Sequence, residues 1–477
     1  MRKRVQFLGA LLWTGMSLVA ADVSFEEKLL LKTTTPVGWD EYAFSPDGRL
    51  LAYSERTKDR KYVLVVGDKK GEPFDVIQGV TFCSDCKTVA YEAGLGNKRY
   101  FVIGDQKVEA FDIPSKPVFS ERGNSVAYGD RKTREMKKRV VFNGKPGEWF
   151  DTVDDLMLNP DGTTVAYSAS QPNPQKGMPL HFMVVNDKKG EAFYSVSAPI
   201  FSTDGKSVAY IAANITPDGK SEEWYVVVDD KKSEVYPDRM AWLSFIPNGK
   251  EVAFIAKKGG KLFIVMGEKK IEDAELFGLS CLVVSPDGKT AAYDVATKTG
   301  WCMVVGDKRG AVFEGSSFGV PVFSPDSTMV SYWVEKGGNR RMVVGDKVGE
   351  EFKQMGQPFF SPVGNKVVYP ATDEAHGYMV VDGRKQEGTP LPFSEPPPSW
   401  SPDGSCMAYR VTTYSVTGPT GQYVIAGDKK SEEFKYVTLP VFSPDGKKVA
   451  FGARKDYTDP KTNQSVYELW WKVIDLK

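Results

Sequence analysis

The chain has 477 residues, of which 41% are apolar, and its 62 basic and 62 acidic side chains cancel to a formal net charge of zero. The apolar share is large enough to fill the interfaces between several packed units. A neutral chain lacks the bulk electrostatic attraction that draws a protein to nucleic acid or to an anionic membrane, so we expect neither partner.

Residues 1–21 have the pattern of a cleaved secretory signal, with a basic start, an apolar stretch over residues 5–20, and the small residues Val19 and Ala21 just before Asp22. The alternative is an uncleaved membrane anchor, but the stretch is shorter than the ~20 residues that a spanning helix needs. We therefore expect a mature chain that begins at Asp22, is periplasmic or secreted, and has no transmembrane span after cleavage.

A turn-and-strand phrase recurs eleven times after this segment, and its fullest form, from Phe442 to Phe451, contains Ser-Pro-Asp-Gly. Pro presets φ for the second position of a type I turn and Gly takes the left-handed fourth position, so the phrase predicts a hairpin tip. Successive phrases start 37 to 44 residues apart, a period typical of propeller blades with four short strands. The phrases start at Ser45, Cys83, Ser120, Asn159, Ser202, Ile246, Ser285, Ser324, Ser361, Ser401 and Ser443.

Each repeat divides into four expected strands, named A to D in chain order. Strand A ends where the phrase starts, strand B contains an aromatic residue eight positions later, strand C is an apolar run such as residues 63–66, and strand D follows a Lys-rich tip. An alanine usually precedes the aromatic residue, and neighbouring strand residues point to opposite faces. Each blade should therefore present a bulky face to one neighbour and a small face to the other. The aromatic residues are Tyr53, Tyr91, Tyr128, Tyr167, Tyr210, Phe254, Tyr293, Tyr332, Tyr369, Tyr409 and Phe451.

Eleven repeats of four strands predict an all-β propeller, whereas one ring usually has roughly four to eight blades. We therefore favour two rings over one large ring, with repeats 1–5 in residues 22–243 and repeats 6–11 in residues 244–477. The last repeat ends on an expected strand C at residues 470–475. The apolar segment at residues 23–31 is expected to supply the missing outermost strand and so to close the last blade.

Pairs of lysines recur at the expected tips between strands C and D. They fit two explanations: solvated charge that protects strand edges, which we favour, or a girdle that binds anions. The pairs are Lys69-Lys70, Lys188-Lys189, Lys231-Lys232, Lys269-Lys270 and Lys429-Lys430.

The repeat resembles the propeller repeats of the TolB family and of its WD-repeat-like relatives. The resemblance rests on the Ser-Pro-Asp-Gly turn between the first two strands of a blade, which occurs at residues 45–48, 285–288, 401–404 and 443–446. It covers nearly the whole chain after residue 21. It implies a propeller fold without implying one function, because such repeats occur in binding proteins and in accessory domains of peptidases.

Four expected B to C connections are long: residues 170–180, 213–223, 412–422 and 455–466. All four would lie on one face of the propeller, and loops on a rigid scaffold are the usual place for binding. Tolerated insertions would explain the same lengths, so both explanations stay open. The residues that we single out for ligand binding are Gln171, Lys176, Asn214, Trp224, Tyr414, Thr420, Asp456 and Asn463.

Five cysteines do not form an even disulfide framework. Cys83 and Cys86 occupy the first and fourth positions of a turn, a spacing that allows a local disulfide and equally suits free thiols. Cys281 and Cys302 fall in strands A and C of one blade, roughly 9 to 10 Å apart, which is too far to bridge. We expect both to be buried.

One catalytic motif is matched by letter, because residues 315–319 read Gly-Ser-Ser-Phe-Gly and satisfy G-x-S-x-G. In a hydrolase that serine sits on a turn between a strand and a helix, with Asp and His later in the chain. Here no helical pattern follows Ser317, and the chain has only His181 and His376. We interpret the match as a turn between blades, and we assign no catalytic residue, metal site or cofactor.

Three classes of function remain. We favour an exported, non-enzymatic binding or scaffold protein that holds a protein, peptide or glycan on its loop face. The alternatives are a propeller enzyme of the lyase or glycosidase type, with carboxylates at the central channel, and a structural assembly component whose repeats mainly build surface.

Overall fold

The computed structural model of the chain describes residues 26–34, 42–45, 50–83, 87–110, 117–120, 125–132, 135–173, 177–238, 240–247, 249–259, 261–272, 281–314, 317–374, 376–386, 398–415 and 418–476. The expected signal segment, Lys176 and Cys86 lie outside these ranges. Within them, no helix has the length and apolar character needed to cross a bilayer.

The named elements are all β-strands, and they form eleven antiparallel sheets of four or five strands, one per repeat. Blade 1 has β2 (Tyr42–Phe44), β3 (Leu51–Arg56), β4 (Tyr62–Val66) and β5 (Lys69–Phe74); blade 2 has β6 (Val76–Phe82), β7 (Val89–Leu95), β8 (Lys98–Ile103) and β9 (Gln106–Ala110); blade 3 has β10 (Val118–Phe119), β11 (Val126–Lys132), β12 (Lys137–Phe142) and β13 (Lys145–Pro146); blade 4 has β14 (Thr152–Leu158), β15 (Val165–Gln171), β16 (Leu180–Val185) and β17 (Lys188–Phe193).

The next four blades follow the same plan, two of them with a divided first strand. Blade 5 has β18 (Ser195–Val196), β19 (Ile200–Phe201), β20 (Val208–Ile215), β21 (Glu222–Val228) and β22 (Lys231–Lys232); blade 6 has β23 (Ala241–Phe245), β24 (Val252–Lys258), β25 (Lys261–Met266) and β26 (Lys269–Glu272); blade 7 has β27 (Leu282–Val284), β28 (Ala291–Ala296), β29 (Trp301–Val305) and β30 (Lys308–Arg309); blade 8 has β31 (Ser317–Phe318), β32 (Val322–Phe323), β33 (Val330–Lys336), β34 (Asn339–Val344) and β35 (Lys347–Phe352).

The last three blades complete the set, and the final one includes the first strand of the chain. Blade 9 has β36 (Gln354–Met355), β37 (Phe359–Phe360), β38 (Val367–Thr372), β39 (Gly377–Val381) and β40 (Arg384–Gln386); blade 10 has β41 (Ser399–Trp400), β42 (Met407–Ser415), β43 (Gly418–Ala426) and β44 (Lys429–Lys430); blade 11 has β45 (Tyr436–Val437), β46 (Val441–Phe442), β47 (Lys448–Thr458), β48 (Ser465–Asp475) and β1 (Lys28–Thr33).

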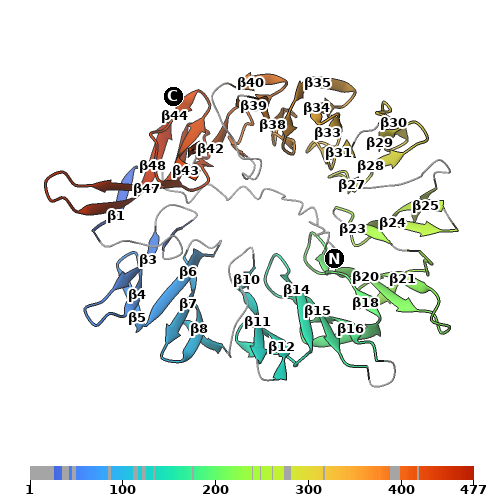
Figure 1. The fold of residues 1–477 in the computed structure, drawn as a ribbon, viewed down its shortest axis with the longest axis horizontal. Coiled ribbons are helices and arrows are strands. Elements are labelled where there is room, and N and C mark those ends of the chain that lie inside the picture. The colour runs from blue at the N-terminus through green and yellow to red at the C-terminus, as the bar shows by residue number, and fades with distance from the viewer. Residues whose placement is uncertain are drawn as a thin grey trace.

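The eleven blades follow one another round a single ring (Figure 1). Our preference for two rings is therefore wrong. Packing is continuous across the expected boundary at residues 243 and 244, because Ala209 of blade 5 and Phe254 of blade 6 share one hydrophobic cluster. The ring closes where Phe44 of blade 1 packs against Trp471 of blade 11, with ring centroids 6.5 Å apart.

At the seams between blades, an alanine of one blade shares a hydrophobic cluster with the aromatic residue of the next, as the alternation predicted, but the face that carries the alanine also holds a bulky residue. At the seam of blades 3 and 4, Ala127 and Phe150 of blade 3 share a cluster with Tyr167 of blade 4. Phe150 and Tyr167 meet edge to face, with centroids 6.2 Å apart and an interplanar angle of 75°. Such aromatic pairs add stability beyond the area that they bury.

The Ser-Pro-Asp-Gly phrase forms the tight turn between strands A and B. In blade 10 the buried Ser401 donates a hydrogen bond to Asp403 Oδ1 at 2.6 Å and accepts one from the backbone N–H of Cys406 at 2.9 Å. Gly404 has φ of 67°, the left-handed conformation expected of the fourth position. The hydrogen bond from Ser401, with further bonds from Ser405, lowers the pKa of Asp403 to about 2. The turn therefore accounts for this repeated carboxylate.

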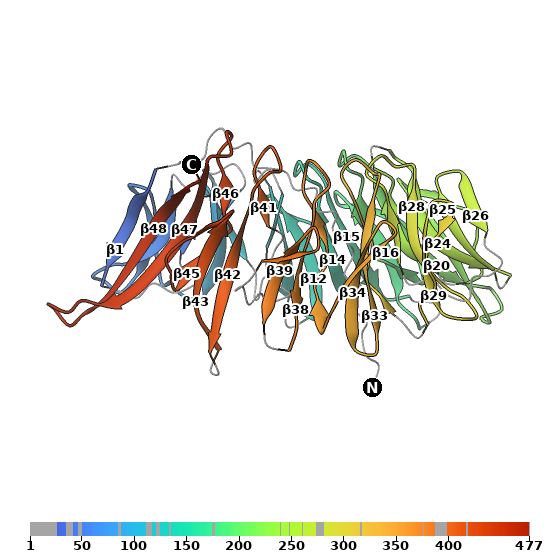
Figure 2. The ribbon, with the colours of Figure 1, turned by 90° about the horizontal axis from the view of Figure 1, so that it is seen from above.

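The first strand of the chain is the outermost strand of the last blade. β1 pairs antiparallel with β48, with Lys28 opposite Trp471 and Thr33 opposite Tyr467. Seen from the side, the turns after β41 and β46 lie on one face of the ring, and the hairpins that join strands B and C lie on the opposite face (Figure 2). We call these the turn face and the hairpin face.

Candidate functional site

On the hairpin face, strands B and C of blades 10 and 11 are longer than in the other blades and form two extended hairpins. Strands β42 and β43 pair as far as Ser415 and Gly418, and strands β47 and β48 pair as far as Thr458 and Ser465. Residues 412–422 and 455–466 were expected to be loops, and that expectation is wrong, because most of them extend the blades as paired strands. The β42–β43 hairpin reaches below its neighbours in Figure 2, and the β47–β48 hairpin projects outward from the ring in Figure 1.

The β42–β43 hairpin holds an exposed aromatic ring on a hydrogen-bonded base. Tyr414 is 56% exposed close to the tip. Next to it, the Thr413 hydroxyl donates to Gly421 O at 3.0 Å or to Glu433 Oε1 at 2.7 Å, and it accepts from Thr420 at 2.9 Å. A tyrosine displayed on a rigid support offers a large contact surface with little loss of conformational entropy, which is typical of binding surfaces.

The β47–β48 hairpin is tied to the closing strand β1 by a buried carboxylate. Glu468 is 8% exposed and accepts hydrogen bonds from Lys32 at 2.9 Å, from the Tyr457 hydroxyl at 2.9 Å and from the Trp470 indole at 3.0 Å. Burial acts to raise the pKa of Glu468, but the three donors outweigh it and the pKa is lowered. We call this group the Glu468 clip, and it joins β1, β47 and β48.

A hollow of about 450 Å³ lies beside the clip, between the end of β1 and the tip of the β47–β48 hairpin. Two of the predicted residues belong to this hairpin but have structural roles. Asp456 forms an ion pair with Arg454 at 2.8 Å, and Asn463 takes φ of 55° in the turn. The residues that line the hollow are Lys32, Thr33, Thr34, Asp459, Thr462, Gln464 and Val466.

The predicted residues of blades 4 and 5 have partners within the fold. Gln171 donates to Glu148 at 2.8 Å, Asn214 accepts the backbone N–H of Tyr194 at 3.4 Å, and Trp224 packs against the cluster between blades 5 and 6. β15, β20 and β21 lie across the ring from β42 and β47 (Figure 1). The predicted residues that the structure describes, which do not include Lys176, therefore do not converge on one site.

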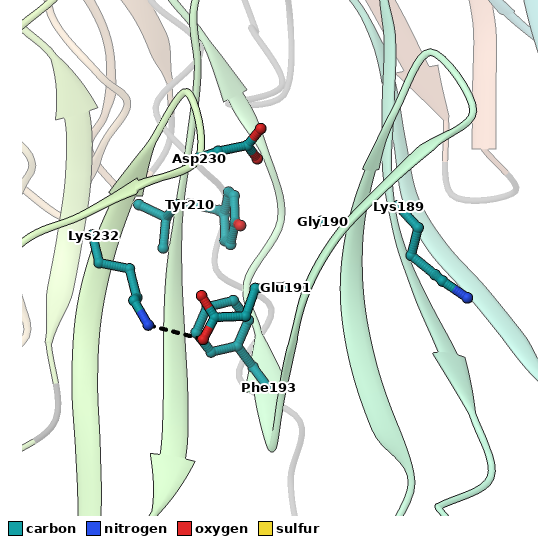
Figure 3. Close-up of a pocket in the computed structure, with 8 residues that line it drawn as sticks. Lys189, Gly190, Glu191, Phe193, Tyr210, Asp230 and Lys232 are labelled. Atoms are coloured by element: carbon teal, nitrogen blue, oxygen red, sulfur yellow. Dashed lines mark hydrogen bonds and ion pairs between the residues drawn. The ribbon is translucent and has the colours of Figure 1, made fainter.

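In three of the five lysine pairs, the second lysine forms an ion pair with a glutamate of the preceding blade, whereas Lys70 pairs with Glu55 of its own blade. Lys232 of blade 5 lies 2.8 Å from Glu191 of blade 4 (Figure 3), and its ammonium lies 5.9 Å from the centroid of the Phe193 ring. The two explanations drawn from the sequence, edge protection and anion binding, did not include an ion pair between blades. The lysine side chains also remain partly exposed to solvent. The corresponding ion pairs between other neighbouring blades are Lys107 with Glu72, Lys189 with Glu148, Lys270 with Glu234, Lys385 with Glu350 and Lys472 with Glu432.

A cavity of about 190 Å³ adjoins the pair of Lys232 and Glu191 (Figure 3). The cavity is far below the roughly 300 to 1,000 Å³ of sites for drug-sized ligands, so an oligosaccharide or a peptide would not fit. It is lined by Lys189, Gly190, Glu191, Phe193, Tyr210, Val227, Asp230 and Lys232.

Ser317 does not have the setting of a hydrolase nucleophile. It lies in β31 and pairs with Glu335 of β33, whereas the motif needs a sharp turn from a strand to a helix. His376 is 70% exposed, and burial lowers the pKa of His181. Across the ranges that the structure describes, no group of three or more His, Cys, Asp and Glu side chains is placed to hold a metal ion.

The cysteine predictions are tested in part. Cys281 and Cys302 are buried, at 3% and 1% exposure, as predicted. Burial also raises the pKa of the Cys281 thiol. Cys83 is buried as well, and Cys86, its predicted partner in a local disulfide, lies outside the described ranges.

Comparison with protein-family models and with curated proteins finds no match. Among solved structures, the chain is similar to a eukaryotic initiation factor, at 14% identity and a TM-score of 0.37 over 70% of this chain and 91% of that chain. It is also similar to the β-propeller domain of the Trilobed protease from Pyrococcus furiosus, at 15% identity and a TM-score of 0.28 over 66% and 96%. A third is a prolyl endopeptidase, at 14% identity and a TM-score of 0.30 over 71% and 51%. Similarity at this level says nothing about ligand or activity.

Two features of the site were missed in the sequence. The ion pairs between blades have a recognisable sequence pattern, because a glutamate follows the second lysine by two positions in phrases such as Lys188-Lys189-Gly190-Glu191. The Glu468 clip had none, because Lys32 and Glu468 lie near opposite ends of the chain and meet only when the ring closes.

Proposed function

We propose that this chain is an exported, non-enzymatic propeller protein with TolB-like, WD-repeat-like repeats, which binds a protein, peptide or glycan on its hairpin face. The proposal places the protein in the periplasm or outside the cell, on the basis of the signal-like pattern of residues 1–21. It includes no nucleic-acid partner, because the chain has no net charge to attract one.

The observation that carries the proposal is the exposed Tyr414 on the extended β42–β43 hairpin. Most blades end their B to C connection in a short turn, whereas this hairpin continues to Ser415 and Gly418. Beyond Thr412 and Gln422, the hairpin residues that the structure describes belong to no hydrophobic core cluster, so ring stability alone gives no reason for the extra length. An exposed aromatic ring among threonine hydroxyls suits contacts with both apolar and polar groups of a partner.

The test compares two shortened variants. One replaces residues 413–421 with Asn-Gly, which suits a two-residue hairpin turn between Thr412 and Gln422. The other shortens residues 216–221 of blade 5 on the same face. After cross-linking in an extract of the native cell envelope, quantitative mass spectrometry should show partner loss only for the first variant. Equal recovery by both variants and the unmodified chain would contradict the proposal.

One observation favours a second function, a propeller enzyme of the lyase or glycosidase type. Asp154 and Asp155 are both exposed on β14, the first strand of blade 4, and Asp155 has φ of 55°, a conformation that is uncommon outside glycine. The Ser168 hydroxyl donates a hydrogen bond to Asp155 Oδ2 at 3.2 Å, and this bond gives the unusual backbone conformation of Asp155 a structural explanation. Turnover of a polysaccharide that is abolished by Asp155→Asn would favour the enzyme.

A further inference from the structure

The seams between blades show a pairing of residue types that the repeat period does not require. In five seams a glycine in strand D, or directly after it, faces the tyrosine of strand B in the next blade. A Cβ placed on each glycine would lie within 4.0 Å of that tyrosine hydroxyl. The five pairs are Gly71 with Tyr91, Gly147 with Tyr167, Gly190 with Tyr210, Gly310 with Tyr332, and Gly349 with Tyr369.

Where the tyrosine is replaced by phenylalanine, the glycine is replaced by serine. Ser233 precedes the seam that contains Phe254, and Ser431 precedes the seam that contains Phe451. The Ser233 hydroxyl accepts the backbone N–H of Val226 at 3.0 Å and donates to Glu234 O at 2.8 Å. Each of these seams therefore has one hydroxyl, which comes either from the aromatic residue or from the preceding blade.

Three oxygen atoms surround the glycine in the seam of blades 3 and 4. A Cβ on Gly147 would lie 2.7 Å from Asp187 Oδ1, 3.2 Å from Val140 O and 3.4 Å from the Tyr167 hydroxyl. Tyr167 is fully buried, and its hydroxyl has no hydrogen-bond partner in the described part of the chain. A buried hydroxyl without a hydrogen-bond partner lowers stability, so this arrangement calls for a partner.

The seam of blades 4 and 5 repeats the arrangement. A Cβ on Gly190 would lie 3.1 Å from Met183 O and 3.8 Å from both Asp230 Oδ1 and the Tyr210 hydroxyl. Burial raises the pKa of Tyr210, so the phenol stays protonated and can donate. The cavity of about 190 Å³ beside Gly190 has room for water, since one water molecule needs only about 30 Å³ (Figure 3).

We propose that the glycine notches beside Tyr167 and Tyr210 each bind an ordered water molecule that bridges the two blades. The water accepts a hydrogen bond from the tyrosine hydroxyl and donates to the carboxylate of Asp187 or Asp230 and to the backbone carbonyl of the preceding blade. Water suits the notch better than a cation, because a cation would leave the phenol proton without an acceptor. Lys232 and Lys189 also stand beside the notches and would repel it.

The chain contains a matched control. Tyr128 is also buried with no hydrogen-bond partner among the residues described, but Val108 stands in the place of the glycine and packs against its cluster. Tyr167→Phe removes the bridge and should lower Tm by about 1–3 °C, whereas Tyr128→Phe removes only an orphaned hydroxyl and should leave Tm unchanged or raise it. If Tyr167→Phe raises Tm as Tyr128→Phe does, the notch is dry and the proposal fails.

A second experiment uses the exchange that the chain itself makes. Tyr210→Phe and Gly190→Ser should each lower Tm, and the double variant should recover at least half of the combined loss, because it recreates the pair of Ser233 with Phe254. Additive losses would contradict the proposal. A high-resolution crystal structure of the unmodified chain should show a density peak within hydrogen-bond distance of the Tyr167 hydroxyl and Asp187. An empty notch there would overturn the inference whatever the variants do.

Discussion

Lys232 Nζ lies 2.8 Å from Glu191 Oε1, and this ion pair joins blade 5 to blade 4 above the rings of Phe193 and Tyr225, at 5.9 and 5.3 Å from their centroids. The two side chains are 37% and 53% exposed, so the Coulomb term is modest. The arrangement recurs at other seams, so it adds many small contributions to a ring whose hydrophobic seams supply most of the stability.

We predict that Lys232→Ala lowers the free energy of unfolding by about 0.5–1.5 kcal/mol, from a partly exposed ion pair and cation–π contacts. Lys231→Ala is the matched control, because Lys231 is the exposed neighbour in the same pair and should change stability by less than about 0.5 kcal/mol. Chemical denaturation in low and high salt measures both. The Lys232 effect should shrink at about 1 M NaCl. Equal effects of the two variants would show that the link contributes nothing.

The Ser-Pro-Asp-Gly turn gives a second prediction. Ser401→Ala removes the bond to Asp403 and the acceptor for the Cys406 amide, both in a buried turn. We expect a loss of about 1–2 kcal/mol by equilibrium unfolding. Ser405→Ala, whose hydroxyl bonds the same carboxylate from an exposed position, should cost less. A larger loss for Ser405→Ala would mean that burial of Ser401 is not what matters.

The Glu468 clip gives a prediction with pH dependence. Lys32→Met removes one of three donors to a buried carboxylate and should lower the free energy of unfolding at pH 7. The pKa of Glu468 is lowered in the folded chain, so its stabilisation is complete above the ordinary glutamate value and is lost as pH falls below it. The variant should therefore lose less stability than the unmodified chain on acidification. Lys28→Met, in the same strand, is the control. If the stability of Lys32→Met and of the unmodified chain fell in parallel with pH, the proposed role of the Glu468 clip would be contradicted.

The repeats could be predicted because their signals are local. The turn at Ser401 and Asp403, and the alternation of Ala127 with Tyr128, each fix conformation within a few residues. The number of rings could not be predicted in this way. It depends on the small rotation between neighbouring blades, which is set by contacts such as Ala209 with Phe254 and accumulates over the whole chain.

On the hairpin face, a local sequence signal led to a wrong prediction. Pro419 and Gly421, with the threonines around them, indicated a loop, yet these residues pair across β42 and β43. The run of β-branched residues Val411, Thr412 and Thr413 was the better guide, because β-branched residues favour strands. The packing of Trp224 was likewise hidden, since its neighbours come from two blades.

The export proposal predicts where the mature chain begins. Mass spectrometry of the protein purified from its native source should give an N-terminal peptide that starts at Asp22, since Val19 and Ala21 are small residues at the expected cleavage site. Changing Ala21 to a large residue should slow cleavage and leave the longer form in the membrane fraction. Recovery of intact residues 1–21 on the native protein would contradict export by a cleaved signal.

The measurement that tests the central claim most directly is paired photo-cross-linking on the two faces. A photoreactive phenylalanine analogue is placed at Tyr414 on the hairpin face or at Val363 on the turn face, two positions of nearly equal exposure at 56% and 54%. In the native cell, we predict a discrete cross-linked product from position 414 and none from position 363. Products from position 363 alone, or identical products from both, would contradict binding on the hairpin face.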